Sequence, residues 1–134
     1  APAIATGINE EGPDIVWGIG GAPEGVLSAA ALKCLDGEIQ ARLKPMTPAE
    51  LDRCHSMEIT NPNRLLTMED LACGEEVVCA VTGITDGDLL KGVRYRGNEV
   101  RTNSLVMRSI TGTIRFIEAV HDLSRKPYKL PADN

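Results

Sequence analysis

The chain has 134 residues, a length that suits one domain. Hydrophobic residues make up 43% and charged residues 25%, as in an ordinary globular domain. The net charge of -5 argues against a protein that binds nucleic acid or an anionic membrane surface, because both need a basic face. No apolar run approaches the roughly 20 residues of a membrane-spanning helix.

The first third of the chain predicts two helices and two strands. Residues 3–8 are apolar and helix-like, with Gly7 as a plausible helix end. The apolar run Ile15–Gly20 predicts a short buried strand, and Pro23–Leu35 predicts a helix with an apolar face at 3/4 spacing. Residues 38–44 alternate apolar and polar side chains, which predicts a strand with one buried face.

Two helix starts are expected in the middle of the chain. Thr47 precedes Pro48 and stands three residues before Glu50, which is a capping-box pattern. Thr67 and Asp70 form a weaker version of the same capping-box pattern.

The last third predicts mainly strands. The continuous apolar run 76–84 favours a central strand, and 86–92 is a loop. Residues 93–109 form one long strand or two paired strands with Gly97 and Asn98 near the turn. Residues 111–123 predict a short strand that passes into a helix, and a polar mobile tail follows. This order of elements indicates a layered α/β or α+β domain.

The segment "GIGGAPEG", Gly18–Gly25, lies between a predicted strand and a predicted helix, where backbone N–H groups can receive an anion. It fails as a dinucleotide fingerprint because Pro23 replaces the third glycine. It also fails as a Walker A loop, because Val26 and Leu27 stand where Lys and Ser or Thr are required.

A carboxylate remains beside an open backbone, since Glu24 follows Gly20 and Gly21 closely. A carboxylate next to a phosphate would repel it unless a divalent cation lay between them. The pattern therefore suggests a metal and a phosphate. The alternative is that Glu24 only stabilises the positive end of the helix dipole.

Four stretches resemble one family: "APAIATGI", "DIVWGIGGAPEGVLSAAALKCLDGEIQARL", "TGITDGDLLKGVRYRG" and "TNSLVMRSITGTIRFIEAVH". They are similar to the C-terminal part of class II (GlpX-type) fructose-1,6-bisphosphatases, from Ala1 to His121, with a looser match over 44–75. The resemblance implies an α/β fold, a layered α/β/α sandwich of the lithium-sensitive, metal-dependent sugar phosphatases, of which this chain would be the C-terminal domain only.

The resemblance also implies an activity. Family members use Mn²⁺ or Mg²⁺ to remove the 1-phosphate of fructose 1,6-bisphosphate in gluconeogenesis, giving fructose 6-phosphate and phosphate. Some photosynthetic members also take sedoheptulose 1,7-bisphosphate. The family motif makes Glu24 a metal ligand and Gly21 a substrate contact. A cytoplasmic homo-oligomer is expected, without nucleic-acid or membrane partners.

The family's other metal ligands and substrate contacts lie upstream of the matched segment. We therefore expect a C-terminal fragment, or one piece of a nicked enzyme, with a domain over 1–121 and a tail over 122–134, whose active site needs the N-terminal part of the same enzyme. Alone it should be inactive, expose apolar surface and self-associate. The alternative is a stand-alone, non-catalytic module that binds a sugar phosphate or another protein.

Other polar residues are interpreted as structural. Asp86 and Asp88 could be a metal pair, but a turn is favoured. His55 is expected on a solvated helix face and His121 beside a carbonyl group. Ser28 has no base in sight. The remaining candidates are Arg94, Arg96 and Arg101, expected on a solvated strand face, and Cys34, Cys54, Cys73 and Cys79, expected as reduced, buried or partly buried thiols.

Overall fold

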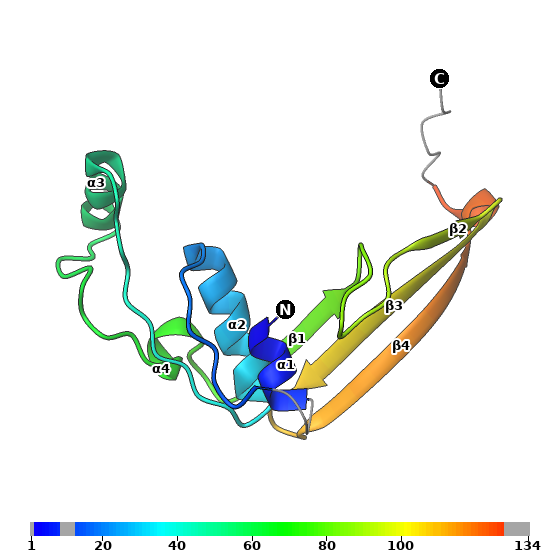
Figure 1. Cartoon of the computed structure of the whole chain (residues 1–134), viewed down its shortest axis with the longest axis horizontal. Coiled ribbons are helices and arrows are strands. Elements are labelled where there is room, and N and C mark those ends of the chain that lie inside the picture. Colours follow the sequence, from blue (N-terminus) through cyan, green and yellow to red (C-terminus); the bar gives the residue numbers. More distant parts are fainter. Residues whose placement is uncertain (1, 9–12, 128–134) are drawn as a thin grey trace.

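The computed structural model describes residues 2–8 and 13–127. In chain order the elements are α1 (Pro2–Ile8), α2 (Ala22–Cys34), α3 (Pro48–Ser56), α4 (Met68–Leu71), β1 (Val78–Thr82), β2 (Arg94–Arg96), β3 (Glu99–Arg108), β4 (Thr113–Asp122) and the 3-10 turn Leu123–Arg125. They form an open arch, with α3 and α4 on one side, α1 and α2 in the middle and the sheet reaching to the other side (Figure 1).

Helix α2 forms where the sequence predicts it. Pro23 and Glu24 occupy its first turn, where a fixed φ and a negative charge are favourable. Its last turn is closed by the main-chain N–H groups of Leu35 and Gly37, which both donate to the carbonyl of Leu32 at 2.9 Å. The helix ends there because Asp36 has a φ of 58°, outside the helical region.

The two predicted capping boxes are confirmed. The Thr47 hydroxyl accepts a hydrogen bond from the main chain of Glu50, and the Glu50 carboxylate accepts one from the main chain of Thr47. The same reciprocal pattern joins Thr67 and Asp70 at the start of α4. In both cases side chains close in sequence satisfy N–H groups that the first helical turn leaves unpaired.

The sheet is antiparallel and centred on β3. Strand β4 pairs with β3 along its whole length, from Glu99 opposite Asp122 to Arg108 opposite Thr113. Strands β1 and β2 share the other side of β3. The hairpin expected around Gly97 and Asn98 is confirmed as β2–β3, with Gly97 at a φ of 59°. The expectation that 76–84 forms the central strand is wrong, because β1 has a single neighbour among the described strands.

Three sequence-based expectations differ from the structure. Ile15–Gly20 is irregular, and 38–44 contains only one isolated bridge, between Ala41 and Leu66. Neither segment has a neighbouring strand over its length in the described part of the chain, and a strand needs the hydrogen bonds of a partner. Residues 113–122 remain a strand throughout, because β3 supplies an unbroken partner, and only a 3-10 turn follows.

The core is small and lies where α1 and α2 cover one face of the sheet. Its main cluster combines Ile4, Ala31 and Cys34 of the helices with three strand residues, Cys79, Leu105 and Met107. A second cluster joins Ala29 and Leu32 of α2 to Met68 of α4. The buried face of α2 thus packs against both the sheet and α4.

The chain exposes much surface for its size. Its accessible area is 10288 Å², whereas a compact protein of this mass would expose about 6,800 Å². Many large apolar side chains contribute, including Trp17 with 95% of its surface exposed. This exposure agrees with the expected apolar surface, and self-association of the chain stays a prediction.

The architecture is therefore mixed α and β with an antiparallel sheet, which is consistent with an α/β phosphatase fold. The second helical layer of an α/β/α sandwich stays a prediction, as does the domain boundary after His121. Strand β4 continues through that boundary to Asp122, and residues 128–134 of the expected mobile tail lie outside the described residues. None of the helices in the described ranges is long and apolar enough to cross a membrane.

Candidate functional site

The glycine-rich loop runs directly into the N-terminus of α2. Residues 15–21 lack regular secondary structure and are exposed. Gly21 is the residue before the helix, with φ of -66° and ψ of 151°, and it has no side chain with which to cap the first turn. Its carbonyl accepts the first helical hydrogen bond, from Gly25 at 3.1 Å. The first turn is thus the kind of helix start at which backbone N–H groups can meet an anion.

The structure brings the two predicted site residues together. The side chain of Glu24 folds back over Gly21, so that a Cβ atom added at residue 21 would overlap Oε2 of Glu24. No neighbouring group within 4 Å would obstruct a Cβ at Gly20, so the backbone before Gly21 is open. A carboxylate and an open stretch of main chain therefore lie side by side on the surface. Their roles as metal ligand and substrate contact stay predictions.

The hydroxyl of Ser28 makes a hydrogen bond within the helix, as expected for a structural residue. It donates to the main-chain carbonyl of Glu24 at 2.7 Å, one helical turn earlier. This bond lies within the helix and engages the Ser28 hydroxyl with the turn that carries Glu24.

Uncovered apolar side chains flank the loop on both sides. Trp17 precedes the loop with 95% of its surface exposed, Ile19 lies within it with 84% exposed, and Leu27 follows it on α2 with 65% exposed. Large apolar groups gathered around a polar loop are typical of a surface that meets another part of a protein.

Glu24 fits one position of a divalent metal centre. A carboxylate oxygen is the ligand type that Mg²⁺ and Mn²⁺ prefer. Within residues 2–8 and 13–127, no three His, Cys, Asp or Glu side chains gather closely enough to hold a metal ion. The described residues thus offer one carboxylate at this place, and a complete centre needs ligands from elsewhere.

Asp86 has the structural role that the turn interpretation favoured. Its carboxylate accepts hydrogen bonds from the main chain of Gly92 at 2.9 Å and from the guanidinium of Arg94 at 2.6 and 2.9 Å. These two donors lower the pKa of Asp86, the Gly92 N–H first and Arg94 second. The carboxylate closes the 86–92 loop, and Asp88 is exposed in the same loop.

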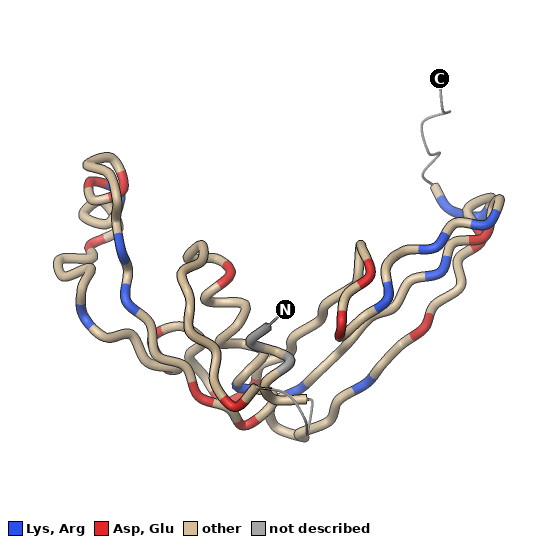
Figure 2. Tube along the Cα trace, viewed as in Figure 1, with Lys and Arg blue, Asp and Glu red and all other residues tan. Residues whose placement is uncertain are grey.

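The three predicted arginines lie at the far end of the sheet, where Figure 2 shows several Lys and Arg residues along the strands. Arg94 pairs with Asp86, and Arg101 pairs with Glu99 at 2.8 Å and with Glu118 at 3.6 Å. Arg96 is exposed. These exposed ion pairs agree with the expectation that the three arginines lie on a solvated strand face.

The histidines and cysteines are also accounted for. His55 is exposed on α3, as expected. His121 differs, because Nε2 lies 3.1 Å from the hydroxyl of Thr102 instead of meeting a carbonyl group. Cys34 and Cys79 are buried free thiols, and burial raises the pKa of both. Cys54 is half-buried, whereas Cys73 is exposed, contrary to the expectation for it.

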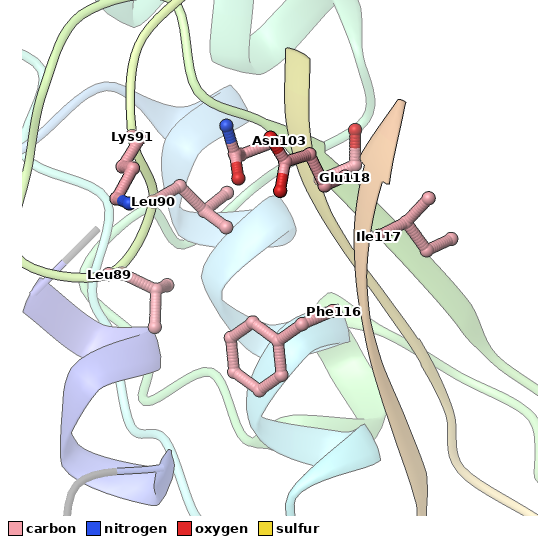
Figure 3. A pocket seen from close by; sticks show the side chains of 8 residues that line it. Leu89, Leu90, Lys91, Asn103, Phe116, Ile117 and Glu118 are labelled. Atoms are coloured by element: carbon pink, nitrogen blue, oxygen red, sulfur yellow. The ribbon is translucent and has the colours of Figure 1, made fainter. Parts of the chain in front are cut away.

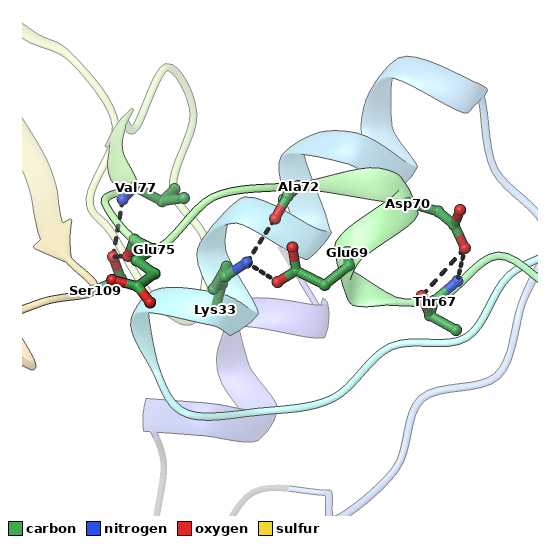
Figure 4. Close-up of polar contacts among 8 residues, drawn as sticks. All are labelled: Lys33, Thr67, Glu69, Asp70, Ala72, Glu75, Val77 and Ser109. Carbon is green, nitrogen blue, oxygen red and sulfur yellow. Dashed lines mark hydrogen bonds and ion pairs between the residues drawn. The ribbon is translucent and has the colours of Figure 1, made fainter.

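Lys33 makes a contact between α2 and α4 that was not predicted from the sequence. Its side chain is 15% exposed, and Nζ donates to the carbonyl of Ala72 at 2.8 Å and pairs with the carboxylate of Glu69 (Figure 4). This contact ties the C-terminal turn of α2 to α4. Only the place of Lys33 in the last turn of a predicted helix could have drawn attention to it, since its partners lie far along the chain.

A pocket of about 310 Å³ lies between the 86–92 loop and the sheet, away from the residues of the glycine-rich loop. Leu89, Leu90 and Phe116 form its apolar part, and Asn103 and Glu118 lie at its polar edge (Figure 3).

Comparison with known proteins identifies the family. Residues 1–121 match the family described as "Bacterial fructose-1,6-bisphosphatase, glpX-encoded". The chain belongs to this family, as the resemblance of its sequence motifs implied.

Two relatives illustrate the extent of the match, both named "D-fructose 1,6-bisphosphatase class 2/sedoheptulose 1,7-bisphosphatase". The protein of Synechococcus sp. (strain JA-2-3B'a(2-13)) is 43% identical over 131 residues, covering 89% of this chain and 38% of that protein. The protein of Synechocystis sp. (strain ATCC 27184 / PCC 6803 / Kazusa) is 44% identical over 118 residues, covering 79% of this chain and 34% of that protein. The chain thus spans little more than a third of the length of these relatives.

Proposed function

We propose that this chain is the C-terminal portion of a class II fructose-1,6-bisphosphatase, a phosphoric monoester hydrolase. The observation that carries the proposal is the contact between Glu24 and Gly21 at the start of α2, in a chain of the glpX-encoded family. The substrate proposed is fructose 1,6-bisphosphate, with sedoheptulose 1,7-bisphosphate as a second one that the names of the relatives suggest.

In this proposal Glu24 binds a Mn²⁺ or Mg²⁺ ion and the main chain at Gly21 contacts the phosphate. A divalent ion would supply Lewis-acid polarisation of the phosphoryl oxygens and activation of water. The chain's own contribution is to hold the carboxylate at a helix start beside an open backbone, where an anion is also favoured by the helix dipole.

The other ligands and substrate contacts come, in this proposal, from the part of the enzyme that the relatives have in addition to the matched segment. The exposed apolar side chains around the loop, Trp17, Ile19 and Leu27, support this view because they offer a surface for that part to cover. A cytoplasmic location and a role in gluconeogenesis remain predictions.

The test is phosphate release from fructose 1,6-bisphosphate with Mn²⁺ or Mg²⁺. It compares this chain alone with a chimera in which the chain replaces the matching segment of the Synechococcus relative. We expect activity from the chimera and none from the chain. A folded chimera without activity would contradict the proposal, and a chain that binds the sugar bisphosphate without turnover would favour the stand-alone binding module.

Glu24→Gln in the chimera tests the metal role. We expect a large loss of activity together with weaker Mn²⁺ binding, measured directly by titration calorimetry. Glu38→Gln is the matched control, because Glu38 is an exposed carboxylate just beyond α2. Unchanged Mn²⁺ binding in Glu24→Gln would show that Glu24 is only a favourable first-turn residue.

A further inference from the structure

Helix α2 is anchored at one end. Its buried residues all lie in its last two turns: Ala29, Ala31, Leu32 and Cys34. Residues 22–27 are exposed apart from the half-buried Gly25, and the start of the helix stands clear of α4 and of the strands (Figure 1). Glu24 lies in this projecting first turn. The place of its carboxylate therefore depends on the direction that the anchored turns give to the helix.

Two kinds of contact hold the anchored end against α4. Ala29 and Leu32 pack against Met68, and such apolar contacts are not directional. Lys33 adds a polar contact, because Nζ donates to the carbonyl of Ala72 at 2.8 Å and also pairs with the Glu69 carboxylate (Figure 4). A hydrogen bond has a preferred length and angle, so this contact restricts how far α2 can slide or tilt on α4.

The Lys33 ammonium cannot easily give up these partners. Its side chain is only 15% exposed, and a largely buried charge that loses its partners is costly. The two acceptors lie within α4 and just beyond its end, so one side chain reads the position of the whole short helix. Cys34 makes a further contact, from Sγ to the carbonyl of Val77 at 3.5 Å, but a thiol is a weak donor.

The length of α2 magnifies small changes at its anchored end. Glu24 and Lys33 are nine residues apart, which corresponds to about 14 Å along a helix. A tilt of about 5° about the anchored end would move the first turn by about 1 Å, whereas a metal site needs its ligands within about 0.5 Å of the correct place. The contacts of Lys33 are thus of the kind that can decide whether Glu24 meets a metal ion.

We propose that Lys33 is a positioning residue for Glu24. It fixes the direction of α2 relative to α4 and thereby sets the place of the Glu24 carboxylate. The geometric part of this inference concerns the chain alone, whereas its consequence for metal binding rests on the proposed function.

Distances between two spin labels test the geometric part on the chain itself. The background carries Cys54→Ser and Cys73→Ser, because these are the thiols that are not buried. Leu27→Cys on α2 and Ile110→Cys between β3 and β4 carry the labels, since both positions are exposed. Pulsed electron paramagnetic resonance should give a narrow distance distribution with Lys33 present, and a broader one with a shifted mean in Lys33→Met.

Two variants control this measurement. Lys33→Arg keeps a cation with several N–H donors and should recover most of the narrow distribution. Lys44→Met makes the same change at an exposed lysine and should leave the distribution as it is. A Lys33→Met distribution equal to that of the parent protein would overturn the proposal.

Mn²⁺ affinity in the chimera tests the consequence for the metal. We expect titration calorimetry to show a fall of about tenfold or more in Lys33→Met, as when a group that orients a metal ligand is lost, and a recovery in Lys33→Arg. Thr47→Ala is the control for a general loss of stability, because it removes the cap of α3 and leaves α2 untouched. Its Mn²⁺ affinity should equal that of the unsubstituted chimera.

The outcomes separate this inference from the proposed function. An unsubstituted chimera that binds Mn²⁺ and releases phosphate, together with unchanged affinity in Lys33→Met, would overturn the inference and leave the proposed function standing. Equal losses of affinity in Lys33→Met and Thr47→Ala would also overturn it, because the effect would then be one of stability. An unsubstituted chimera that binds no Mn²⁺ would contradict the proposed function and the metal role of Lys33 together, and the label distances would still decide the geometric part.

Discussion

Oδ1 of Asp70 accepts a hydrogen bond of 2.8 Å from the guanidinium of Arg64, six residues earlier in the chain. The other carboxylate oxygen accepts one of 2.9 Å from the main-chain N–H of Thr67, at the start of α4 (Figure 4). One side chain thus closes the 64–70 turn and caps the helix that follows.

This arrangement predicts a pH dependence of stability. Arg64 first, and the Thr67 N–H second, lower the pKa of Asp70 from 3.8 to about 2. A lowered pKa stabilises the folded state above the unfolded-state pKa, and the stabilisation is lost as the pH falls from 3.8 toward 2. Thermal unfolding should therefore show wild type more stable than Asp70→Asn near neutral pH, with a difference that shrinks in this acid range.

Asp52→Asn is the control for that measurement, since it removes the same charge from the exposed surface of α3. A difference between wild type and Asp70→Asn that stays constant down to pH 2 would mean that the carboxylate does not act through its ionised form.

Leu105→Ala should strongly destabilise the chain. Leu105 is fully buried between the sheet and the helices α1 and α2, so truncation leaves a cavity in the main cluster. The expected loss in free energy of unfolding is about 2–5 kcal/mol, measured by chemical denaturation. Leu27→Ala removes the same atoms from an exposed position and should change it by less than about 0.5 kcal/mol. Equal losses would show that the core lies elsewhere.

Lys33→Met should loosen α4 from α2. The change keeps the apolar stem but removes the donor to Ala72 and the partner of Glu69, whose pKa Lys33 lowers. Because Glu69 is exposed, the ion pair itself contributes little, and the lost bond to Ala72 should cost about 1 kcal/mol. Hydrogen exchange of residues 68–72 should become faster, while that of β3 should not. Unchanged exchange in α4 would mean that Leu32 and Met68 hold it without Lys33.

Gly21→Ala should disturb the candidate metal ligand without disturbing the fold. The φ of -66° suits any residue, but the new Cβ would displace the Glu24 carboxylate from its place over residue 21. In the chimera we expect Mn²⁺ affinity to fall on the order of tenfold or more, as when a group that orients a ligand is lost. Gly20→Ala is the control, because space there is open. Equal affinities in both variants would contradict a role for this contact.

The sequence predicted best those features whose causes are local. The starts of α3 and α4 follow from Thr47 with Glu50 and Thr67 with Asp70, and the β2–β3 turn follows from Gly97 and Asn98, because each is stabilised by residues a few positions apart. The pairing of Gly21 with Glu24 is local in the same way, because the two residues are three positions apart at a helix start and lie in contact in the structure.

Features that need distant partners were not predictable in this way. Ile15–Gly20 has the composition of a buried strand, yet it is exposed in the described structure, because composition does not supply the neighbouring strand. The contact of Lys33 with Ala72 spans 39 residues, and no local pattern marks it.

The sequence by itself determined where the helices begin, which residues form the glycine-rich loop, and the family to which the chain belongs. Only the tertiary structure decided that β3, not β1, is the central strand, that β4 extends to Asp122 and pairs with β3 alone among the described strands, and that α2 joins the sheet to α4. The physical reason is that strand order and edge exposure depend on which distant main-chain groups pair, whereas helix starts depend on side chains within one turn.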